Sequence, residues 1–280
     1  MLRLATQGTR VEDGELSPSP DRENAAEPNV TIFIASINTT AATELCIRSI
    51  ARYTPRDAYT LCVGDCGSTD NSLPRLMAMV HENLIDDVML APHGRSHGAW
   101  LDLWTNTCTT RYAVMVDSDT EILKEDWLDV LLKTAHDSEA AIVCAEILEE
   151  VPQYVDYTGV PRRLARRPSA WMMLVDVAKC RERASWQFAM ESDPNIPEQQ
   201  WAFDTGAQLM RALSLAGETV VAAPSFFQRC FRHYGGLSWV KMTRSRGWRA
   251  RAHRLKVGLL DLYLFARLKR MKVPRTRKHP

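Results

Sequence analysis

Two aspartates one residue apart, Asp117 and Asp119, have the spacing in this chain that most strongly suggests chemistry. They follow the apolar run Val114–Val116, so they lie where a buried strand meets solvent. Two carboxylates so close repel each other unless a cation lies between them, and a divalent cation with oxygen ligands keeps positions open for phosphate groups. A surface turn is the alternative, because Asp and Ser are common turn residues. The pair therefore predicts either a metal site for a phosphate-bearing substrate or a plain turn.

The length and composition of the chain limit the class of protein to which it can belong. The 280 residues suffice for one large core, and the 45% hydrophobic and 25% charged fractions are those of a soluble globular protein, which excludes disordered and fibrous classes for most of the length. The seven cysteines are odd in number and several lie inside apolar runs, which predicts buried thiols in a reducing compartment. No signal peptide or membrane-spanning run is visible, so we expect a cytoplasmic location.

The charge is unevenly distributed along the chain. Residues 241–280 hold 14 Lys and Arg against the single acid Asp261, so this segment carries 14 − 1 = +13. Because the formal net charge of the chain is +1, the first 240 residues carry +1 − 13 = −12. An acidic body with a basic tail is evidence about binding partners and not about fold.

The order of the patterns predicts three segments: a disordered leader over 1–28, an α/β domain over 29–240 and a basic helical tail over 241–280. The leader is rich in Ser, Pro, Glu, Asp and Asn and has no periodic apolar face. In the domain, strands and helices alternate, which is typical of a doubly wound, mostly parallel α/β sheet with flanking helices. The strands are expected over 30–37, 60–63, 87–90, 112–116, 140–145, 171–177 and 220–223, and the helices over 41–53, 71–80, 96–107, 124–135 and 204–216.

Polar residues follow three of these strands directly. The first strand leads into Ser36 and Asn38, the second into Asp65, and the fourth into Asp117 and Asp119. Ligands of such sheets bind at the carboxyl ends of the strands. We therefore expect these side chains to converge on one ligand.

Two of the motifs resemble those of a known family. The segment GDCGSTDNS, from Gly64 to Ser72, and the segment VDSD, from Val116 to Asp119, are similar to motifs of the family-2 glycosyltransferases, which are inverting nucleotide-sugar enzymes with the GT-A fold. The resemblance covers about residues 30–145 well and the next hundred residues loosely. It implies a GT-A type sheet and a metal-dependent transfer of sugar from a nucleoside-diphosphate sugar.

The resemblance also implies roles for the donor-side residues. Asp65 would contact the base or ribose of the nucleotide, with Ser36 and Asn38 beside the base. Asp119 would bind Mn²⁺ or Mg²⁺ across the donor diphosphate, and Asp117 would serve the ribose or the same metal. For Asp65, an Asx turn or a helix N-cap is the structural alternative.

The acceptor side is less well matched. Asp204 lies in a segment similar to the family's Glu-Asp pair and would be the general base on the acceptor hydroxyl. Phe203 and Gly206 replace acids of that pattern, and Asp204 also suits a helix N-cap. Glu198 is the reserve candidate for the base.

Two further positions complete the expected site. His233 stands where many GT-A enzymes have a late histidine ligand to the metal, although a lone His is also often only packed or solvated. Gly98, in the segment HGAWLD, would let the backbone approach the donor at a helix N-terminus, whereas Asp102 is expected to face solvent.

The basic tail contains a helical pattern over 249–272, with leucines among many Arg and Lys residues. This pattern is typical of an interfacial helix on anionic lipid, and would place the protein on the inner face of the plasma membrane. A helix packed on the body with a solvated basic face and a nucleic-acid patch are the alternatives. No nucleic-acid recognition motif accompanies it, so no nucleic-acid partner is expected.

The resemblance thus implies a glycosyltransferase whose acceptor is a glycan or a lipid-linked glycan of the cell envelope. Two rival functions remain. An α/β-hydrolase would use Ser96 in a G-x-S-x-G segment, with Asp204 and His233 in the expected order, but Pro92 and His93 stand where apolar strand residues should precede the turn. A protein that binds nucleotide sugar without catalysis is the second rival.

Overall fold

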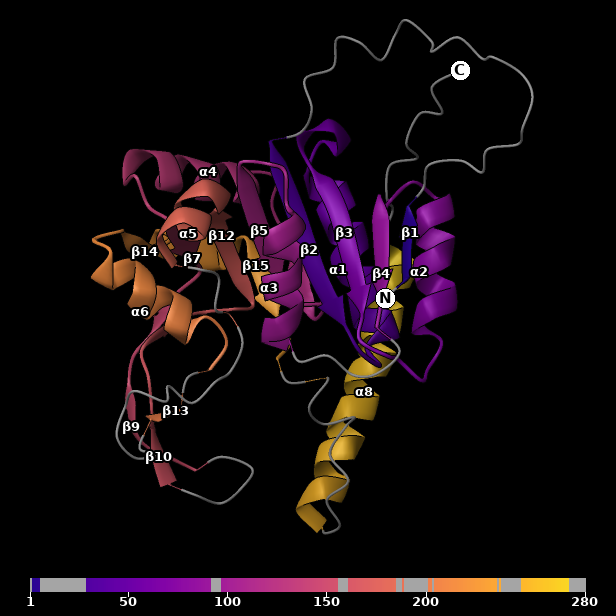
Figure 1. Ribbon diagram of the computed structural model, residues 1–280. Helices are drawn as coiled ribbons and strands as arrows, with labels where there is room; N and C mark the ends of the chain where they lie inside the picture. Colours follow the sequence, from indigo (N-terminus) through magenta and orange to yellow (C-terminus); the bar gives the residue numbers. More distant parts are fainter. Residues whose placement is uncertain are drawn as a thin grey trace, which may run out of the picture.

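The computed structural model describes residues 2–5, 29–91, 97–155, 161–184, 188, 201–202, 204–235, 237 and 248–271. Its centre is an eight-stranded sheet with the order β1-β4-β3-β2-β5-β12-β7-β14 (Figure 1). The strands are, in chain order, β1 (Leu2–Ala5), β2 (Val30–Ser36), β3 (Thr60–Asp65), β4 (Asp87–Leu90), β5 (Tyr112–Val116), β7 (Ile142–Cys144), β12 (Met172–Asp176) and β14 (Val220–Ala222).

The direction of the strands confirms a mostly parallel sheet over its first half. Strands β4, β3, β2 and β5 are parallel to one another, and β14 is parallel to β7. Strand β12 lies between β5 and β7 and is antiparallel to both. Parallel neighbours align their carboxyl ends at one edge, so the residues after β2, β3 and β5 meet there, as expected from the sequence.

Helices cover both faces of the sheet (Figure 1). One core holds side chains of α1, α2 and α4, and the core on the other face holds those of α3, α5 and α6. Because both faces of the sheet are covered, residues on both sides of a strand are apolar. In β5, for example, Val114 packs into the first core and Met115 into the second. The helices are α1 (Thr40–Tyr53), α2 (Ser72–His81), α3 (His97–Thr107), α4 (Trp127–Asp137), α5 (Val177–Ala184) and α6 (Ala207–Leu215), with short 3-10 helices η2 (Arg56–Ala58) and η3 (Ser225–Arg229).

Three small sheets draw mainly on the second half of the chain, where the sequence predicts little regular structure. Strand β6 (Thr120–Ile122) pairs with β15 (Phe231–His233), and β8 (Ile147–Leu148) pairs with β11 (Arg167–Pro168). The third sheet has the order β13-β10-β9 and consists of β9 (Val151–Val155), β10 (Pro161–Leu164) and β13 (Trp201–Ala202).

The basic helix α8 (Trp248–Arg270) packs on the body rather than standing apart from it. Leu264 and Val257 are buried against Ala41 and Leu45 at the start of α1. This packing accounts for one side of the helix. The expected contact with a membrane remains a prediction. Among the described residues, no helix is both long and apolar enough to cross a bilayer.

The N-terminal segment differs in part from the expected leader. Leu2–Ala5 form β1, which pairs antiparallel with β4 so that Leu2 lies opposite Leu90. The short alternation of Leu2, Arg3 and Leu4 suits an edge strand. The composition of residues 1–28 as a whole does not reveal this strand, because most of the residues that follow are polar. Residues 6–28 lie outside the described part, so their disorder remains a prediction, as do the segment bounds at 28 and 240.

All seven cysteines are free and buried, which confirms the interpretation of the thiols as small apolar residues. Burial raises the pKa of Cys66 to about 12 and that of Cys144 to about 11. These thiols therefore stay protonated and unreactive near neutral pH.

The buried carboxylate of Glu121, two residues after Asp119, forms an ion pair with Arg267 of α8. Its side chain is fully buried and accepts hydrogen bonds from the Tyr234 hydroxyl at 2.7 Å and from Arg267 Nε at 2.8 Å. Removing Arg267 would leave a buried charge with one neutral donor, which is costly.

Replacing Arg267 with methionine is therefore expected to lower the free energy of unfolding by about 1–3 kcal/mol, the cost of losing a charged hydrogen bond that is partly open to solvent. Adding Glu121→Gln to the same chain should restore part of the loss, since a buried amide costs less than a buried charge. Urea unfolding measures both, with Lys269→Met on the exposed side of α8 as the control. Equal stability of Arg267→Met and this control would contradict the role given to the ion pair.

Candidate functional site

The chain turns sharply after β5, and this turn presents the aspartate pair. Thr120 N donates to the Asp117 carbonyl at 3.0 Å, which closes a turn over Ser118. The Ser118 hydroxyl is buried and bonds to Thr39 Oγ1 at 3.1 Å, at the start of α1. Asp119 is nearly buried, whereas the Asp117 side chain is 30% exposed. The pair does lie in a turn, but the turn faces inward against other elements.

His233 reaches the pair because β15 pairs with β6, which places it opposite Thr120. Tyr234 N also donates to the Asp119 carbonyl at 2.9 Å and extends this pairing. His233 Nε2 then lies 3.2 Å from Asp119 Oδ1 and 3.7 Å from Asp117 Oδ2. The ring stacks on Trp171 at a centroid distance of 4.8 Å, which fixes its orientation.

These three side chains form a group that fits a divalent cation. One ligand atom from each of Asp117, Asp119 and His233 can be chosen so that all three lie within 4.8 Å of one another. Two carboxylate oxygens and one imidazole nitrogen suit Mn²⁺ well and leave coordination positions for phosphate oxygens. Among the residues that the structure describes, this is the one group of three or more such side chains with this spacing.

The charges in the group shift the pKa values of Asp117 and His233. Burial raises the pKa of Asp117, and the negative charges of Asp119 and Asp204 raise it further, whereas His97 lowers it. His97 Nε2 lies 3.4 Å from Asp117 Oδ1. For His233, burial opposes protonation, but the hydrogen bond with Asp119 and the charge of Asp117 outweigh burial and raise its pKa.

The raised pKa of His233 predicts that metal binding weakens on acidification. A proton on Nε2 competes with a metal for the same lone pair, and a raised pKa extends this competition above the ordinary histidine value of about 6.5. Mn²⁺ affinity should therefore fall as the pH drops through the region around and above 6.5. Titration calorimetry across this range measures it, and His233→Asn should bind Mn²⁺ more weakly with a flatter pH profile. An unchanged pH profile in that variant would exclude His233 as the ligand that titrates.

Asp65 ends β3 and has one carboxylate oxygen free for a ligand. Oδ2 accepts hydrogen bonds from Gly67 N at 3.2 Å and Ser68 N at 3.0 Å, so the Asx-type turn considered from the sequence is present. Oδ1 is buried and has no hydrogen-bond partner among the described residues. A buried carboxylate oxygen without a donor is costly, and a bound N–H or O–H group would satisfy it.

Ser36 and Asn38 lie beside Asp65 but differ in what their side chains do. Asn38 adopts the left-handed conformation with φ 52°, and its Oδ1 accepts from Thr69 N at 2.8 Å, which links the loops after β2 and β3. The Ser36 hydroxyl is buried and bonds to Thr43 at 2.9 Å. Both shape the loops around Asp65. The Ser36 side chain is engaged inside the fold, so only its backbone position borders this region.

Gly98 lies in the first turn of α3, next to His97, and is buried. This position brings the start of α3 to Asp117 through the His97 contact. Asp102, one turn later, does not simply face solvent as expected from the sequence. Its Oδ1 accepts a hydrogen bond from Phe188 N at 2.8 Å.

The negative charge of Asp204 contributes to the raised pKa of Asp117, which agrees with the expectation that Asp204 lies on the acceptor side of the same site. Its carboxylate is 42% exposed and accepts a hydrogen bond from Arg167 Nε at 3.1 Å. Helix α6 begins at Ala207, later than expected, and its N-cap residue is Gly206 with φ 83°. The Asp204 side chain therefore does not cap α6, and its Oδ1 accepts a hydrogen bond from Thr205 N at 2.8 Å.

Four residues of this site escaped the sequence-based reasoning: His97, Glu146, Arg167 and Trp171. His97 contacts Asp117, Arg167 contacts Asp204, Trp171 stacks on His233, and the charge of Glu146 acts on His233. Two of them carried a signal in the sequence: His97 begins the segment HGAWLD, and Arg167 ends a basic cluster at 162–167. Ser96, Glu198 and Phe203 lie outside the described residues.

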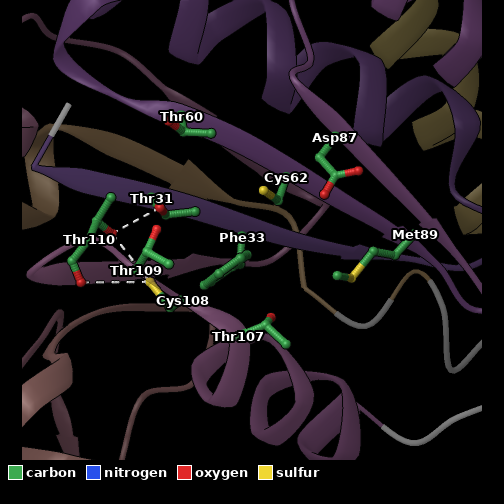
Figure 2. Close-up of a pocket in the computed structure, with 10 residues that line it drawn as sticks. All are labelled: Thr31, Phe33, Thr60, Cys62, Asp87, Met89, Thr107, Cys108, Thr109 and Thr110. Carbon is green, nitrogen blue, oxygen red and sulfur yellow. Dashed lines mark hydrogen bonds between the residues drawn. The ribbon is translucent and has the colours of Figure 1, made fainter. Parts of the chain in front are cut away.

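A separate pocket of about 280 Å³ lies at the other end of the sheet (Figure 2). It is lined by Thr31 and Thr60 at the start of β2 and β3, by Asp87 at the start of β4, and by the chain that follows α3, including Cys108. The aspartate pair follows the carboxyl end of β5, so this pocket is not part of the candidate metal site.

Comparison with known proteins identifies the family of this architecture. The family model described as "Glycosyl transferase family 2" matches residues 31–189. The structure of a mannosyltransferase from Pyrobaculum calidifontis, in complex with GDP-Man and Mn²⁺, is similar with a TM-score of 0.53 and 14% identity over 91% of this chain and 76% of that chain. This likeness confirms the GT-A type fold.

A second solved structure, S. aureus TarS 1-349, matches with a TM-score of 0.43 and 12% identity over 63% of this chain. TarS has also been solved in complex with UDP-GlcNAc, with the same TM-score and identity. This chain spans 58% of the TarS chain, less than two thirds of its length. No curated protein matches the chain at a significant level.

Proposed function

The chain belongs to glycosyl transferase family 2, and on this premise we propose that it transfers a sugar from a nucleoside-diphosphate sugar to an acceptor hydroxyl. The observation that carries the proposal is the convergence of Asp117, Asp119 and His233 at the carboxyl end of β5. Two carboxylates and an imidazole around one point suit a divalent cation that binds a diphosphate.

The donor binds along the carboxyl ends of β2, β3 and β5. The free oxygen of Asp65 accepts an N–H of the base or a ribose hydroxyl, and Asn38 holds the loop beside it. Asp119 and His233 hold Mn²⁺ or Mg²⁺, and Asp117 serves the same metal or the ribose. When bound, the metal ion acts as a Lewis acid that stabilises the departing nucleoside diphosphate.

Asp204 is the general base of the proposed reaction. Its carboxylate takes the proton from the acceptor hydroxyl while the hydroxyl oxygen bonds to the anomeric carbon. The bond between that carbon and the diphosphate oxygen breaks, and its electron pair leaves with the nucleoside diphosphate. Attack in line with the departing group inverts the anomeric configuration. Arg167 orients Asp204 by holding Oδ2, which supports a fixed position for the base.

We infer a glycan or lipid-linked glycan of the cell envelope as the acceptor and a hexose as the transferred sugar. The partly exposed carboxylate of Asp204 suits an acceptor that enters from solvent. A lipid-linked acceptor at an anionic membrane surface would also agree with the strongly basic C-terminal segment.

Thermal unfolding with a panel of nucleoside diphosphates, each with and without Mn²⁺, tests the proposal. A ligand at about one hundred times its Kd stabilises by about 2.7 kcal/mol, which raises Tm by several degrees for a chain of this size. We expect one nucleotide to do so only with Mn²⁺. If no nucleotide shifts Tm with Mn²⁺ or Mg²⁺, the proposal fails. Slow release of nucleoside diphosphate from the matching nucleotide sugar would exclude a protein that binds without catalysis.

A further inference from the structure

Helix α8 has one side fixed to the body, which determines where its other side points. Leu264 is fully buried against α1, and Arg267 Nε donates to the buried Glu121 at 2.8 Å. Arg232, next to His233, donates from Nη1 to the Tyr263 hydroxyl at 3.0 Å. The helix therefore sits in a fixed orientation close to the strands that carry the candidate metal ligands.

The outward side of α8 is apolar. Leu255, Leu259 and Leu262 are 67%, 60% and 67% exposed and follow one another at spacings of four and three residues, so they form one row along the helix. At 100° per residue this row lies opposite Leu264. Five of the eight large hydrophobic side chains that are exposed among the described residues belong to α8, namely Leu255, Leu259, Leu262, Tyr263 and Phe265. We call Leu255, Leu259 and Leu262 the leucine row.

The charge around the leucine row limits what could cover it. The sequence of α8 contains seven basic residues and one acid, and the whole segment from residue 241 carries +13. A second copy of the chain would bring an equally basic segment to the same place, which is unfavourable. Nucleic acid would neutralise the charge but leave the leucines in water. An anionic bilayer matches both properties, because its headgroups attract the basic side chains and its interface accepts the leucines.

We propose that the leucine row of α8 docks on an anionic lipid bilayer. In Figure 1, α8 extends beyond the body of the main sheet. The docked helix holds the strands of Glu121 and His233 near the lipid headgroups through the Arg267 and Tyr263 contacts. The docking stands without the proposed transfer, but its consequence, an acceptor whose reacting hydroxyl is carried by a membrane lipid, rests on that proposed function.

Vesicle flotation of the full chain tests the docking. Vesicles of phosphatidylcholine alone are compared with vesicles that also contain phosphatidylglycerol, in the absence of nucleotide and metal. The test variant carries Leu259→Gln and Leu262→Gln, which keeps the charge and the helix propensity of α8. The matched control carries Leu215→Gln and Phe226→Gln, which changes two exposed apolar side chains elsewhere.

The wild type and the control should float with the anionic vesicles only, and the test variant should bind at least about tenfold more weakly, since it loses the transfer of two leucine side chains. Equal binding of variant and control would overturn the proposal, as would no binding of the wild type. So would a dimer, seen by light scattering, that only the test variant breaks. Nucleotide-induced stabilisation of the same proteins with Mn²⁺ reports separately on the proposed transfer.

Discussion

Replacing Asp119 with asparagine is expected to reduce Mn²⁺ affinity by at least about a hundredfold and to abolish the metal-dependent binding of nucleoside diphosphate. Asp119 is the nearly buried acid of the pair and lies 3.2 Å from His233 Nε2, so it faces the point that a cation would occupy. Loss of a group that only orients a metal ligand already costs about 10–100-fold in affinity, and loss of a ligand should cost more. Titration calorimetry with Mn²⁺, alone and with nucleotide, measures both effects.

The same substitution should leave the metal-free protein at least as stable as the wild type. It removes one of two carboxylates whose mutual repulsion contributes to the raised pKa of Asp117. Asp129→Asn, on the exposed side of α4, makes the same chemical change away from the site and is the control for binding and stability. If Asp119→Asn binds Mn²⁺ and nucleotide like this control, the metal site is wrongly placed.

Replacing Asp204 with asparagine is expected to slow sugar transfer by about 10²–10⁴-fold, the usual contribution of a general base. The amide has nearly the shape of the carboxylate and keeps an oxygen that can accept from Arg167, but it cannot take a proton. Donor and Mn²⁺ affinity should change little, because Asp204 lies on the acceptor side of the proposed site. The measurement is the release of nucleoside diphosphate from the nucleotide sugar, with water or an added acceptor as the nucleophile.

The effects of Asp204→Asn on kcat and on the donor KM together distinguish a general base from a residue that binds the donor. Loss of a general base lowers kcat and leaves the donor KM nearly unchanged, whereas loss of a donor contact raises KM. Arg167→Met serves as a companion variant. It removes the hydrogen bond that orients Asp204, but the carboxylate itself is still present and can still accept a proton. An unchanged kcat in Asp204→Asn would reject Asp204 as the base.

The donor side of the site could be predicted from the sequence because it depends on local patterns. The apolar run before Asp117 indicated a buried strand, and parallel strands align their carboxyl ends, so Asp65 and Asp119 had to lie at the same edge. Strand ends were expected within one or two residues for β2, β4 and β5. The free oxygen of Asp65 could not be predicted, since it depends on which donors the folded loop leaves out.

The acceptor side and the late ligand depend on pairings between distant segments. His233 is brought to Asp119 by the short strands β15 and β6, which are three residues long and have no clear pattern. Trp171 and Arg167 reach the site because β12 inserts antiparallel between two strands of the sheet. The packing of α8 on α1 follows from buried Leu264, which the sequence shows as one leucine among many.

The central claim is that Asp117, Asp119 and His233 hold one divalent cation to which the donor diphosphate binds. Crystals grown with Mn²⁺ and the stabilising nucleoside diphosphate, measured at the manganese absorption edge, test it directly. We predict one anomalous peak in contact with Asp119 and His233, with diphosphate oxygens completing the coordination. A diphosphate bound elsewhere, or a manganese peak away from these side chains, would contradict the claim.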